Sequence, residues 1–465
     1  MALRAAALNT ECKFSLNNWM TLYMNLNTIE TNNSTLDPIE HNSTALEGLS
    51  FILVSPNVSE QMGGEAIKAL QISLELTLRG ARVHQVTHER VKAELDRNFP
   101  QMCVSYVKDT WTQKIAYRAG LLNPLLSAII SAPLISIIFQ RRAVRLVQAL
   151  LRDCPESIVH FTAPVSPVLP YLRIPSRPRA TVVIGPINGN IHYPPALRDR
   201  ESIGYRLQRR LHPLLQLVNR AMFSGKRDAD VLLVAGGERT RRSLLMAGCR
   251  EEQFVDSIDS GVLDRLCETP RLMHPGRNLS FVHNGRLVSH KGTDLIIKSL
   301  RRTRNPVELD IIGRGPELDK LKALSQELSL QNRVRFIEWI ADHRDLATTL
   351  RRYRAFVFPS LAEANGIVVQ EAMVMGLPVI ALNWGGPSLL VTAETGILID
   401  PVSEEYIIDK LAHAMDTLAE DGNLAERMSA AGRQRALEKG FLWSSVVKEW
   451  TKHYRQLVKP HFENR

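Results

Sequence analysis

Two runs of short apolar strands alternating with amphipathic helices constrain the fold of this chain more than any other feature. In the first run, the strand pattern of residues 51–54 leads through a polar, glycine-containing loop into a helix pattern at 67–78, and a second strand pattern follows at 83–86. Apolar residues recur at steps of three and four in the helix, whereas the strand patterns are short and continuously apolar. This order predicts two parallel strands joined by a crossover helix. The later strand patterns of the run are 158–161, 180–184 and 231–234.

The second run begins at residues 281–284, after a stretch at 264–278 that contains Pro270, Pro275 and Gly276. Its further strand patterns are 307–312, 334–337, 355–358 and 378–382, and its helix patterns are 293–300, 317–328 and 367–375. A chain of 465 residues is also too long for one typical domain. We therefore predict an α/β fold with two Rossmann-like, doubly wound domains that face each other across a cleft.

The same patterns predict the domain boundaries. We expect a mobile tail at 1–49, a first domain at 50–265, a linker at 266–278, a second domain at 279–440 and a C-terminal helix at 441–465 that packs back toward the first domain. The tail is aperiodic and rich in Asn and Thr, and it has no compact apolar stretch of the kind found in secretory signals. No internal repeat is visible.

The charge and the cysteines narrow the class of protein. The net charge is +10, so the surface should attract an anionic partner: nucleic acid, an anionic membrane or a diphosphate. No nucleic-acid-binding module and no basic tract interleaved with aromatic residues is recognisable, so we expect no nucleic-acid partner. The five cysteines are far apart, with no CxxC pair. This pattern favours neither a zinc site nor disulfides and predicts a cytoplasmic protein.

Two segments raise the question of membrane contact. Residues 120–139 carry no charge over a length that could span a bilayer, but Pro124, Pro133 and several serines interrupt them, which favours a buried or interfacial pair of helices. Residues 205–227 form a basic amphipathic helix pattern. Its basic residues are Arg206, Arg209, Arg210, His212, Arg220, Lys226 and Arg227. It predicts either a helix on the cytoplasmic face of an anionic membrane or an ordinary packed helix with a solvated basic face.

The strongest chemical pattern is the strand–loop–helix of residues 358–372. The free N–H groups at the start of such a helix form an anion site that suits a diphosphate. Glu371 lies inside the helix, where its carboxylate can accept hydrogen bonds from ribose hydroxyls, and Glu363 lies in the loop, placed to meet hydroxyls beyond the phosphates. The alternative is that both glutamates are ordinary solvated residues of the helix and its start.

A second loop, at 285–294, follows the first strand of the second domain. Arg286 and Lys291 would emerge at the carboxyl end of that strand, where two cations can hold a diphosphate without a metal. The alternative is a surface loop with scattered charge. The Gly313–Gly315 pair after the next strand is a weaker phosphate-binding pattern. The turn at Gly63 and Gly64 in the first domain is a credible partner for the same phosphates from across the cleft.

Taken together, several segments resemble the donor domain of family-four glycosyltransferases of the GT-B fold. They are GRLVSHKG, IIGRGPELDKLKAL, FPSLAEANGIVVQEAMVMGLPVIA and NWGGP in the second domain. SPNVSEQMGGEA, IVHFTAPVSP and IGPINGNIHYPPAL in the first domain resemble a branch used in bacterial exopolysaccharide and lipid-linked glycan assembly. The resemblance implies transfer of a hexose-type sugar from a UDP- or GDP-sugar, with retention and with neither metal nor cofactor. It implies a glycan or polyprenyl-diphosphate-linked acceptor.

The resemblance also implies roles for single residues. Arg286 and Lys291 match the cations that bind the diphosphate and assist catalysis, Glu371 matches the ribose-binding carboxylate, and Glu363 matches the catalytic-site carboxylate near the donor sugar. Further matches to donor-binding positions are Gly63, Gly64, Gly313, Asn365, Gly366, Ile367 and Val368.

Three positions depart from the family pattern or invite another interpretation. Relatives often carry a catalytic histidine at a strand end of the first domain. Here Thr162 occupies that position and His160 lies two residues earlier, so His160 is either a catalytic candidate or a packed histidine. Leu389 stands where relatives often have a glutamate. The motif Asp228-Ala229-Asp230 has the DxD form of metal-dependent transferases, but it precedes a strand, which predicts a helix-to-strand turn and no metal site.

A sugar-nucleotide epimerase is the alternative with the same fold. Transfer to an added acceptor, rather than conversion of the free nucleotide sugar, distinguishes the two. Nucleic-acid binding is the alternative from another class, and it would show steep salt dependence without binding of a nucleotide sugar.

Overall fold

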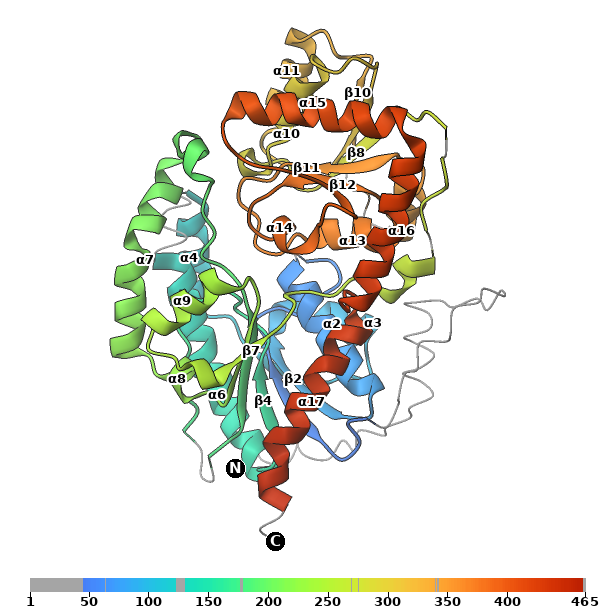
Figure 1. Ribbon diagram of the computed structural model, residues 1–465. Coiled ribbons are helices and arrows are strands. Elements are labelled where there is room, and N and C mark those ends of the chain that lie inside the picture. The colour runs from blue at the N-terminus through green and yellow to red at the C-terminus, as the bar shows by residue number, and fades with distance from the viewer. Residues whose placement is uncertain are drawn as a thin grey trace.

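The computed structural model describes residues 45–62, 64–122, 130–175, 179–268, 270–274, 276–338, 340 and 343–462. Each half of the described chain forms one parallel sheet covered by helices, and the two domains lie one above the other in Figure 1. The predicted α/β fold of two doubly wound domains is therefore confirmed. Most of the predicted tail, residues 1–44, lies outside the described residues, as does Gly63.

The first sheet has seven strands in the order β3-β2-β1-β4-β5-β6-β7. Their bounds are β1 Ser50–Val54, β2 Arg82–His88, β3 Cys103–Val107, β4 Ile158–Phe161, β5 Val182–Ile187, β6 Val231–Val234 and β7 Phe254–Asp256. The helices of this domain are α2 Gly64–Leu78, α3 Lys92–Asn98, α4 Trp111–Leu122, α6 Ala132–Asp153, α7 Ile203–Met222, α8 Gly225–Asp228 and α9 Glu238–Met246. Every residue of β1 is buried because helices cover both faces of a parallel sheet, which explains its continuously apolar sequence.

The second sheet has six strands in the order β10-β9-β8-β11-β12-β13. The strands are β8 Ser280–Asn284, β9 Glu308–Ile312, β10 Val334–Ile337, β11 Ala355–Phe358, β12 Val379–Leu382 and β13 Gly396–Ile399. The helices are α10 Thr293–Leu300, α11 Leu318–Glu327, α12 His343–Leu350, α13 Ile367–Met375, α14 Pro387–Leu390, α15 Glu404–Glu420 and α16 Gly422–Glu438. The strand order reverses between β8 and β11, so the loops that follow these two strands start side by side.

The C-terminal helix α17, Trp443–Phe462, leaves the second domain and runs down along the first (Figure 1). Trp450 and Tyr454 are buried in one core cluster with Phe51 and Leu53 of β1. The Trp450 indole donates a hydrogen bond to Ser257 Oγ at 2.9 Å. The last helix therefore packs against the first domain.

The chain passes from one domain to the other twice, and these two segments lie next to each other. Val262 N donates to Phe441 O at 2.7 Å, and Trp443 N donates to Val262 O at 3.1 Å. Leu266 and Cys267 then lie in the core of the second domain. The first residues of the predicted linker at 266–278 are therefore not a free connection, because their apolar side chains are buried beneath α13 and α16.

Candidate functional site

The reversal of strand order joins the two cleft loops that the sequence singled out. His290 O, in the loop after β8, accepts hydrogen bonds from Leu361 N at 2.7 Å and from Ser360 Oγ at 3.2 Å, in the loop after β11. Gly292 has a φ of +68°, and a Cβ there would lie 2.4 Å from Pro359 O. Only glycine permits this approach without strain, so the local sequence HKG brings the two loops into contact.

Lys291 and Glu363 meet at this contact. The Lys291 ammonium donates to the Glu363 carboxylate and lies 5.0 Å from the centre of the Phe358 ring. The sequence assigned the two residues to different parts of a ligand, and the structure pairs them with each other. An ammonium has three N–H donors, so the pair leaves donors of Lys291 available to a phosphate while Glu363 fixes its position.

The helix α13 begins beside this pair. Gly366, with a φ of +83°, precedes the helix, and its N–H donates to Glu363 Oε1 at 3.3 Å. The N–H groups of Ile367 and Val368 belong to the first turn, which has no acceptors within the helix. Their partial positive charge adds to that of Lys291, so the start of α13 is suited to an anion.

Arg286 and His290 also belong to the loop after β8. Arg286 is exposed. Burial lowers the pKa of His290 to about 4, with Lys291 as the next contribution, so this histidine is neutral at pH 7. The loop after β8 therefore presents two cations at this point, Arg286 and Lys291.

The structure explains why glycine stands at position 313, which the sequence pattern did not. A Cβ at Gly313 would lie 2.0 Å from Gly285 O, and Leu287 N donates to Arg314 O at 2.9 Å. The loops after β8 and β9 therefore pack directly on each other, and Gly313 permits that contact. This packing fixes the backbone on both sides of Arg286.

Glu371 lies one turn inside α13 and is half-buried. Burial raises the pKa of its carboxyl to about 7. The neighbouring Gln370 is fully buried and accepts a hydrogen bond from Asn365 Nδ2 at 3.2 Å. Gln370 holds Asn365 at the cleft, and the sequence reasoning did not single it out because a polar residue on a helix carries no signal by itself.

We expect nucleotide binding to depend on the ionisation of Glu371. The carboxyl is neutral well below pH 7 and charged above it, and a carboxylate accepts stronger hydrogen bonds from ribose hydroxyls than a neutral acid does. UDP or GDP should therefore bind at least about threefold more tightly at about pH 8 than at about pH 6. Titration calorimetry of the wild type and Glu371→Gln tests this, because the variant should lose the dependence. An equal slope in both would contradict it.

The same carboxyl has the opposite effect on the stability of the free protein. Its folded pKa is raised, so the folded state favours the neutral acid. The stability that this preference contributes is present at acid pH and is lost as the pH rises through about 7.

The first domain contributes Arg239, which the sequence analysis missed. This residue of α9 donates to Gly189 O at 3.2 Å, to Asn188 Oδ1 at 3.2 Å and, across the cleft, to Ala364 O at 2.5 Å. The pair Gly236–Gly237 after β6 was the available signal, since it repeats the strand–glycine–helix pattern of the other cleft loops. Arg239 thus ties the loop after β5 to the loop that carries Glu363.

A second contact crosses the cleft from the NWGGP loop. The Trp384 indole donates to His192 O at 2.8 Å. Behind it, a Cβ at Gly385 would lie 2.6 Å from Glu363 O, and one at Gly386 would lie 2.4 Å from Asn365 O. The glycines therefore let this loop support the backbone of the Glu363 loop from behind.

His160 is not in the cleft, and the interpretation of it as a catalytic residue is wrong. Its ring is completely buried, with Nε2 2.9 Å from Gly185 O and Nδ1 3.0 Å from the Tyr454 hydroxyl. Burial lowers its pKa to about 4. It packs α17 onto the first sheet. Thr162, at the end of β4, is also buried. Gly64 is the first residue of α2.

Asp228 and Asp230 lie away from the cleft, before the amino end of β6. Asp230 accepts from Val182 N at 2.8 Å and from Arg179 at 3.1 Å, and Asp228 accepts from Ser224 Oγ at 2.6 Å. The predicted helix-to-strand turn is confirmed. Within the described residues, the structure has no cluster of three or more His, Cys, Asp or Glu side chains that could hold a metal ion.

Another cavity lies away from these loops. It has a volume of about 950 Å³, and Ser280, Glu308 and Arg352 line it at the amino ends of the strands of the second domain. A smaller cavity of about 200 Å³ lies between α7 and the loop after β5. The smaller one adjoins the cleft, because Asn188 and His192 line it and also take part in the contacts with Arg239 and Trp384.

The helix α7 has an inverted pattern of burial. Its polar residues His212, Gln216 and Asn219 are buried, whereas Leu217 is 56% exposed and Met222 is 71% exposed. Gln216 Nε2 donates to Pro167 O at 3.1 Å and to Ser243 Oγ at 2.6 Å, and these hydrogen bonds offset the cost of its burial. The side of α7 that packs on the protein is therefore formed by these polar residues, and not by an apolar stripe that includes Leu214 and Leu217.

The position of three basic residues in the 205–227 segment also differs from the prediction. His212 is buried, Lys226 is buried and donates to Pro167 O at 2.5 Å, and Arg209 pairs with the buried Glu201 at 3.2 Å. Arg206, Arg210 and Arg220 remain exposed.

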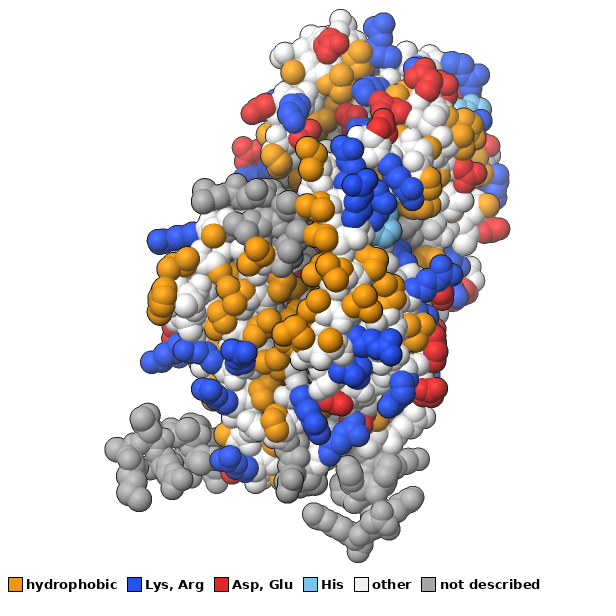
Figure 2. Space-filling model, turned by 90° about the vertical axis from the view of Figure 1, so that its left-hand side faces the viewer, with side chains coloured by type: hydrophobic (Ala, Val, Ile, Leu, Met, Phe, Trp, Pro, Cys, Tyr) orange, Lys and Arg blue, Asp and Glu red, His pale blue; other side chains and the backbone are white. Residues whose placement is uncertain are grey.

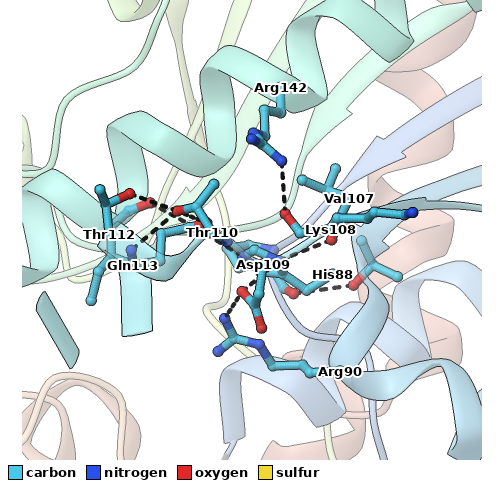
Figure 3. Close-up of polar contacts among 12 residues, drawn as sticks. His88, Arg90, Val107, Lys108, Asp109, Thr110, Thr112, Gln113 and Arg142 are labelled. Atoms are coloured by element: carbon cyan, nitrogen blue, oxygen red, sulfur yellow. Dashed lines mark hydrogen bonds and ion pairs between the residues drawn. The ribbon is translucent and has the colours of Figure 1, made fainter. Parts of the chain in front are cut away.

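Helix α4 presents apolar side chains on the same side of the first domain as α7. Thr110 Oγ1 accepts from Gln113 N, and Gln113 Oε1 accepts from Thr110 N, both at 3.1 Å, so a capping box starts the helix. Asp109 lies immediately before this helix, and its Oδ1 is 2.6 Å from Arg90 Nη2 and 3.2 Å from His88 Nδ1. Figure 3 shows these contacts. The exposed apolar residues that follow are Trp111, Ile115 and Tyr117.

Figure 1 shows α4 and α7 on the same side of the first domain, and Figure 2 views that side. Hydrophobic side chains gather there, with Lys and Arg around them (Figure 2). Among the described residues, no helix is both long enough and apolar enough to cross a bilayer. Residues 123–129, in the uncharged segment 120–139, lie outside the described residues.

Comparison with known proteins finds a family model that covers the loops of the second domain. Residues 270–435 match the family model described as glycosyl transferases group 1. The lipopolysaccharide core biosynthesis glycosyltransferase LpsD of Rhizobium meliloti is 34% identical over 163 residues, which cover 35% of this chain and 46% of that protein. The uncharacterized glycosyltransferase YqgM of Bacillus subtilis is 28% identical over 231 residues, 49% of this chain and 61% of that protein. The chain thus spans about half the length of the curated relatives it matches.

Several solved structures have a fold similar to that of this protein. The sucrose-phosphate synthase of Thermosynechococcus elongatus has a TM-score of 0.61 and 18% identity, covering 89% of this chain and 100% of its own. HepE of Anabaena, in complex with UDP and glucose, has a TM-score of 0.55 and 17% identity, covering 88% of this chain and 100% of its own. Residues 270–435, in the second domain, are therefore similar to the group 1 glycosyltransferases, and the two domains together have the GT-B fold.

Proposed function

We propose that this protein transfers a hexose-type sugar from a UDP- or GDP-sugar to a hydroxyl of a glycan or lipid-linked acceptor, with retention and without a metal. The observation that carries the proposal is the convergence of Lys291, Glu363 and the start of α13 at one point of the cleft. Arg286 adds a second cation there, and Glu371 supplies a carboxylate one turn along. The complex of HepE with UDP and glucose supports a nucleotide and a sugar as the ligands of such a cleft.

The arrangement suggests how the reaction proceeds. The bond between the anomeric carbon and the leaving phosphate oxygen breaks while the acceptor oxygen forms its bond on the same face. The proton of the acceptor hydroxyl passes to the leaving phosphate. Negative charge grows on that phosphate, and Arg286, Lys291 and the N–H groups of Ile367 and Val368 stabilise it. Glu363 orients Lys291, and the contact of Arg239 with Ala364 O holds the loop in place.

Nucleotide screening followed by product analysis tests this function. UDP or GDP should raise the melting temperature, ADP should do so less, and the matching sugar nucleotide should then be turned over in the presence of EDTA. Product analysis with an added acceptor should find a new glycosidic bond of retained configuration. Conversion of the free sugar nucleotide without transfer would show an epimerase, and activity that EDTA abolishes and Mn²⁺ restores would contradict the metal-free mechanism.

We also propose that the protein works at an anionic membrane surface through α4 and α7. A helix that buries polar residues and exposes Leu214, Leu217 and Met222 leaves apolar area without a partner in the fold. Arg206, Arg210 and Arg220 surround this area on the same helix, which is the combination of apolar and basic side chains that binds anionic lipid. An acceptor carried on a lipid would be presented at such a surface.

Charge reversal on α7 tests the membrane contact. The triple variant Arg206→Glu, Arg210→Glu and Arg220→Glu should bind phosphatidylglycerol vesicles at least about tenfold more weakly, since each basic residue near the surface contributes about 1 kcal/mol. Flotation measures the bound fraction. Lys320→Glu, on α11 of the second domain, is the matched control and should bind as the wild type does. A wild type that ignores these vesicles at low salt would contradict the proposal.

A further inference from the structure

The loop between β5 and α7 crosses from the first domain onto the second. It contains the short 3-10 helix η3, Pro195–Arg200. Tyr193 and Leu197 in this loop are 3% and 2% exposed. They belong to the same buried cluster as Leu287, in the loop after β8, and Leu295 of α10. Apolar side chains of this loop are therefore part of the core of the second domain, although the chain on both sides of the loop belongs to the first.

Arg200 adds ionic contacts at the end of the same loop. Its guanidinium lies 2.7 Å from the carboxylate of Asp294, in the first turn of α10, and 3.6 Å from that of Glu404 on α15. Lys298 pairs with the same two carboxylates, at 3.6 Å and 2.6 Å. The four side chains are 20–37% exposed, so solvent screens these pairs less than pairs at a free surface. Arg200 thus joins the first domain to two helices of the second.

The contacts of this loop lie on both sides of Lys291 in the sequence. Ser289, two residues before Lys291, forms a side-chain hydrogen bond with Tyr193, which opposes the rise in the pKa of Tyr193 that burial causes. Asp294, three residues after Lys291, accepts the hydrogen bond of Arg200. The short segment that carries Lys291 is therefore held before and after this lysine by side chains of the first domain.

We propose that Tyr193 and Arg200 are positioning residues, which from the first domain hold the segment that carries Lys291. The proposal rests on the proposed transferase function. Neither side chain needs to touch the sugar nucleotide, because a displacement of a catalytic group by about 1 Å can lower a rate about a hundredfold. If the contacts only joined the two domains, their loss would change stability and nucleotide affinity, but it would not change kcat through Lys291.

Charge reversal at Arg200 tests the proposal by steady-state kinetics with the sugar nucleotide identified by nucleotide screening. Arg200→Glu places a third carboxylate beside Asp294 and Glu404, so it should lower kcat at least about tenfold, with a smaller change in KM. Arg200→Lys keeps the charge and should retain kcat within about threefold of the wild type. Arg198→Glu, exposed on the same 3-10 helix, is the matched control and should keep wild-type kinetics.

Double variants show whether the two residues act through Lys291. In a Lys291→Ala background, Arg200→Glu should change kcat by less than about twofold, because the group that Arg200 positions is gone. Tyr193→Phe removes only the hydroxyl that bonds with Ser289, so it should lower kcat about threefold in the wild type. In the Lys291→Ala background, Tyr193→Phe should also have little further effect.

Three results would overturn the proposal. One is a kcat of Arg200→Glu within about twofold of the wild type, and another is an equal loss of kcat with and without Lys291. The third is a rise in KM alone, which would show that the contacts only join the domains. If Arg200→Glu does not fold, the same cycle with Tyr193→Phe decides between these results. A wild type that transfers no sugar would instead contradict the proposed function.

Discussion

Lys291→Ala is expected to lower kcat about a hundredfold, which corresponds to about 2.7 kcal/mol of transition-state stabilisation. Lys291 is only 16% exposed and lies beside the start of α13, so its ammonium acts in a partly desolvated site. Negative charge on the leaving phosphate grows in the transition state, and a group that stabilises this charge affects kcat more than KM. Steady-state kinetics with the sugar nucleotide identified by nucleotide screening measures both constants.

The ion pair with Glu363 gives this prediction a second test. Glu363→Gln should also lower kcat, because Lys291 loses its orienting partner, and the double variant should be little worse than Lys291→Ala alone. Lys320→Ala, at an exposed position of α11 in the same domain, should keep wild-type kinetics. If Lys291→Ala retains kcat within about threefold, a factor worth about 0.65 kcal/mol, then Lys291 is not at the reacting phosphate.

Trp450→Ala is expected to destabilise the protein by about 3–5 kcal/mol, the usual cost of removing a buried tryptophan side chain. Trp450 is 2% exposed, shares a core with β1, and contacts the ring of His160 edge-on at a centroid distance of 5.9 Å. Its removal also leaves Ser257 Oγ without the indole donor. A lower denaturation midpoint, by urea or by heat, measures the loss.

The control is Lys452→Ala on the same helix. Its side chain is 66% exposed, so the variant should unfold as the wild type does. The nucleotide affinity of folded Trp450→Ala should remain normal, because α17 packs on the first domain and not on the loops that carry Lys291 and Glu363. A denaturation midpoint equal to that of the wild type would mean that α17 is not docked on the first sheet in solution.

The position of the cleft loops could be predicted from the sequence because the signal is local. A buried parallel strand is a continuous apolar run, and a loop with glycine and charged residues follows it in the same segment. Arg286, Lys291 and Glu363 each follow a recognisable strand, and the carboxyl ends of parallel strands meet at one edge of the sheet. The inference to a shared site therefore needed only the order of strands and helices.

Helix α7 shows where local patterns fail. Its sequence left two alternatives open, a helix on a membrane surface and a packed helix with a solvated basic face, because periodicity shows only that a helix has two different faces. Which face turns inward depends on the partner, and here Pro167 O and Ser243 Oγ accept hydrogen bonds from Gln216 Nε2. Burying the polar face costs little because those hydrogen bonds are made, and Leu214 and Leu217 stay exposed.

The amino-acid sequence by itself determined the two parallel α/β domains and the loops that form the cleft, since strand, helix and glycine patterns arise from neighbouring residues. Only the tertiary structure decided which residues far apart in the sequence contact each other. Lys291 meets Glu363 across 72 positions, Arg239 meets Ala364 O across 125, and His160 meets Tyr454 across 294. The last pair turned a catalytic candidate into a packed histidine, because a residue's role depends on what is folded against it. Periodicity records the face a residue occupies but not the distant group that covers it.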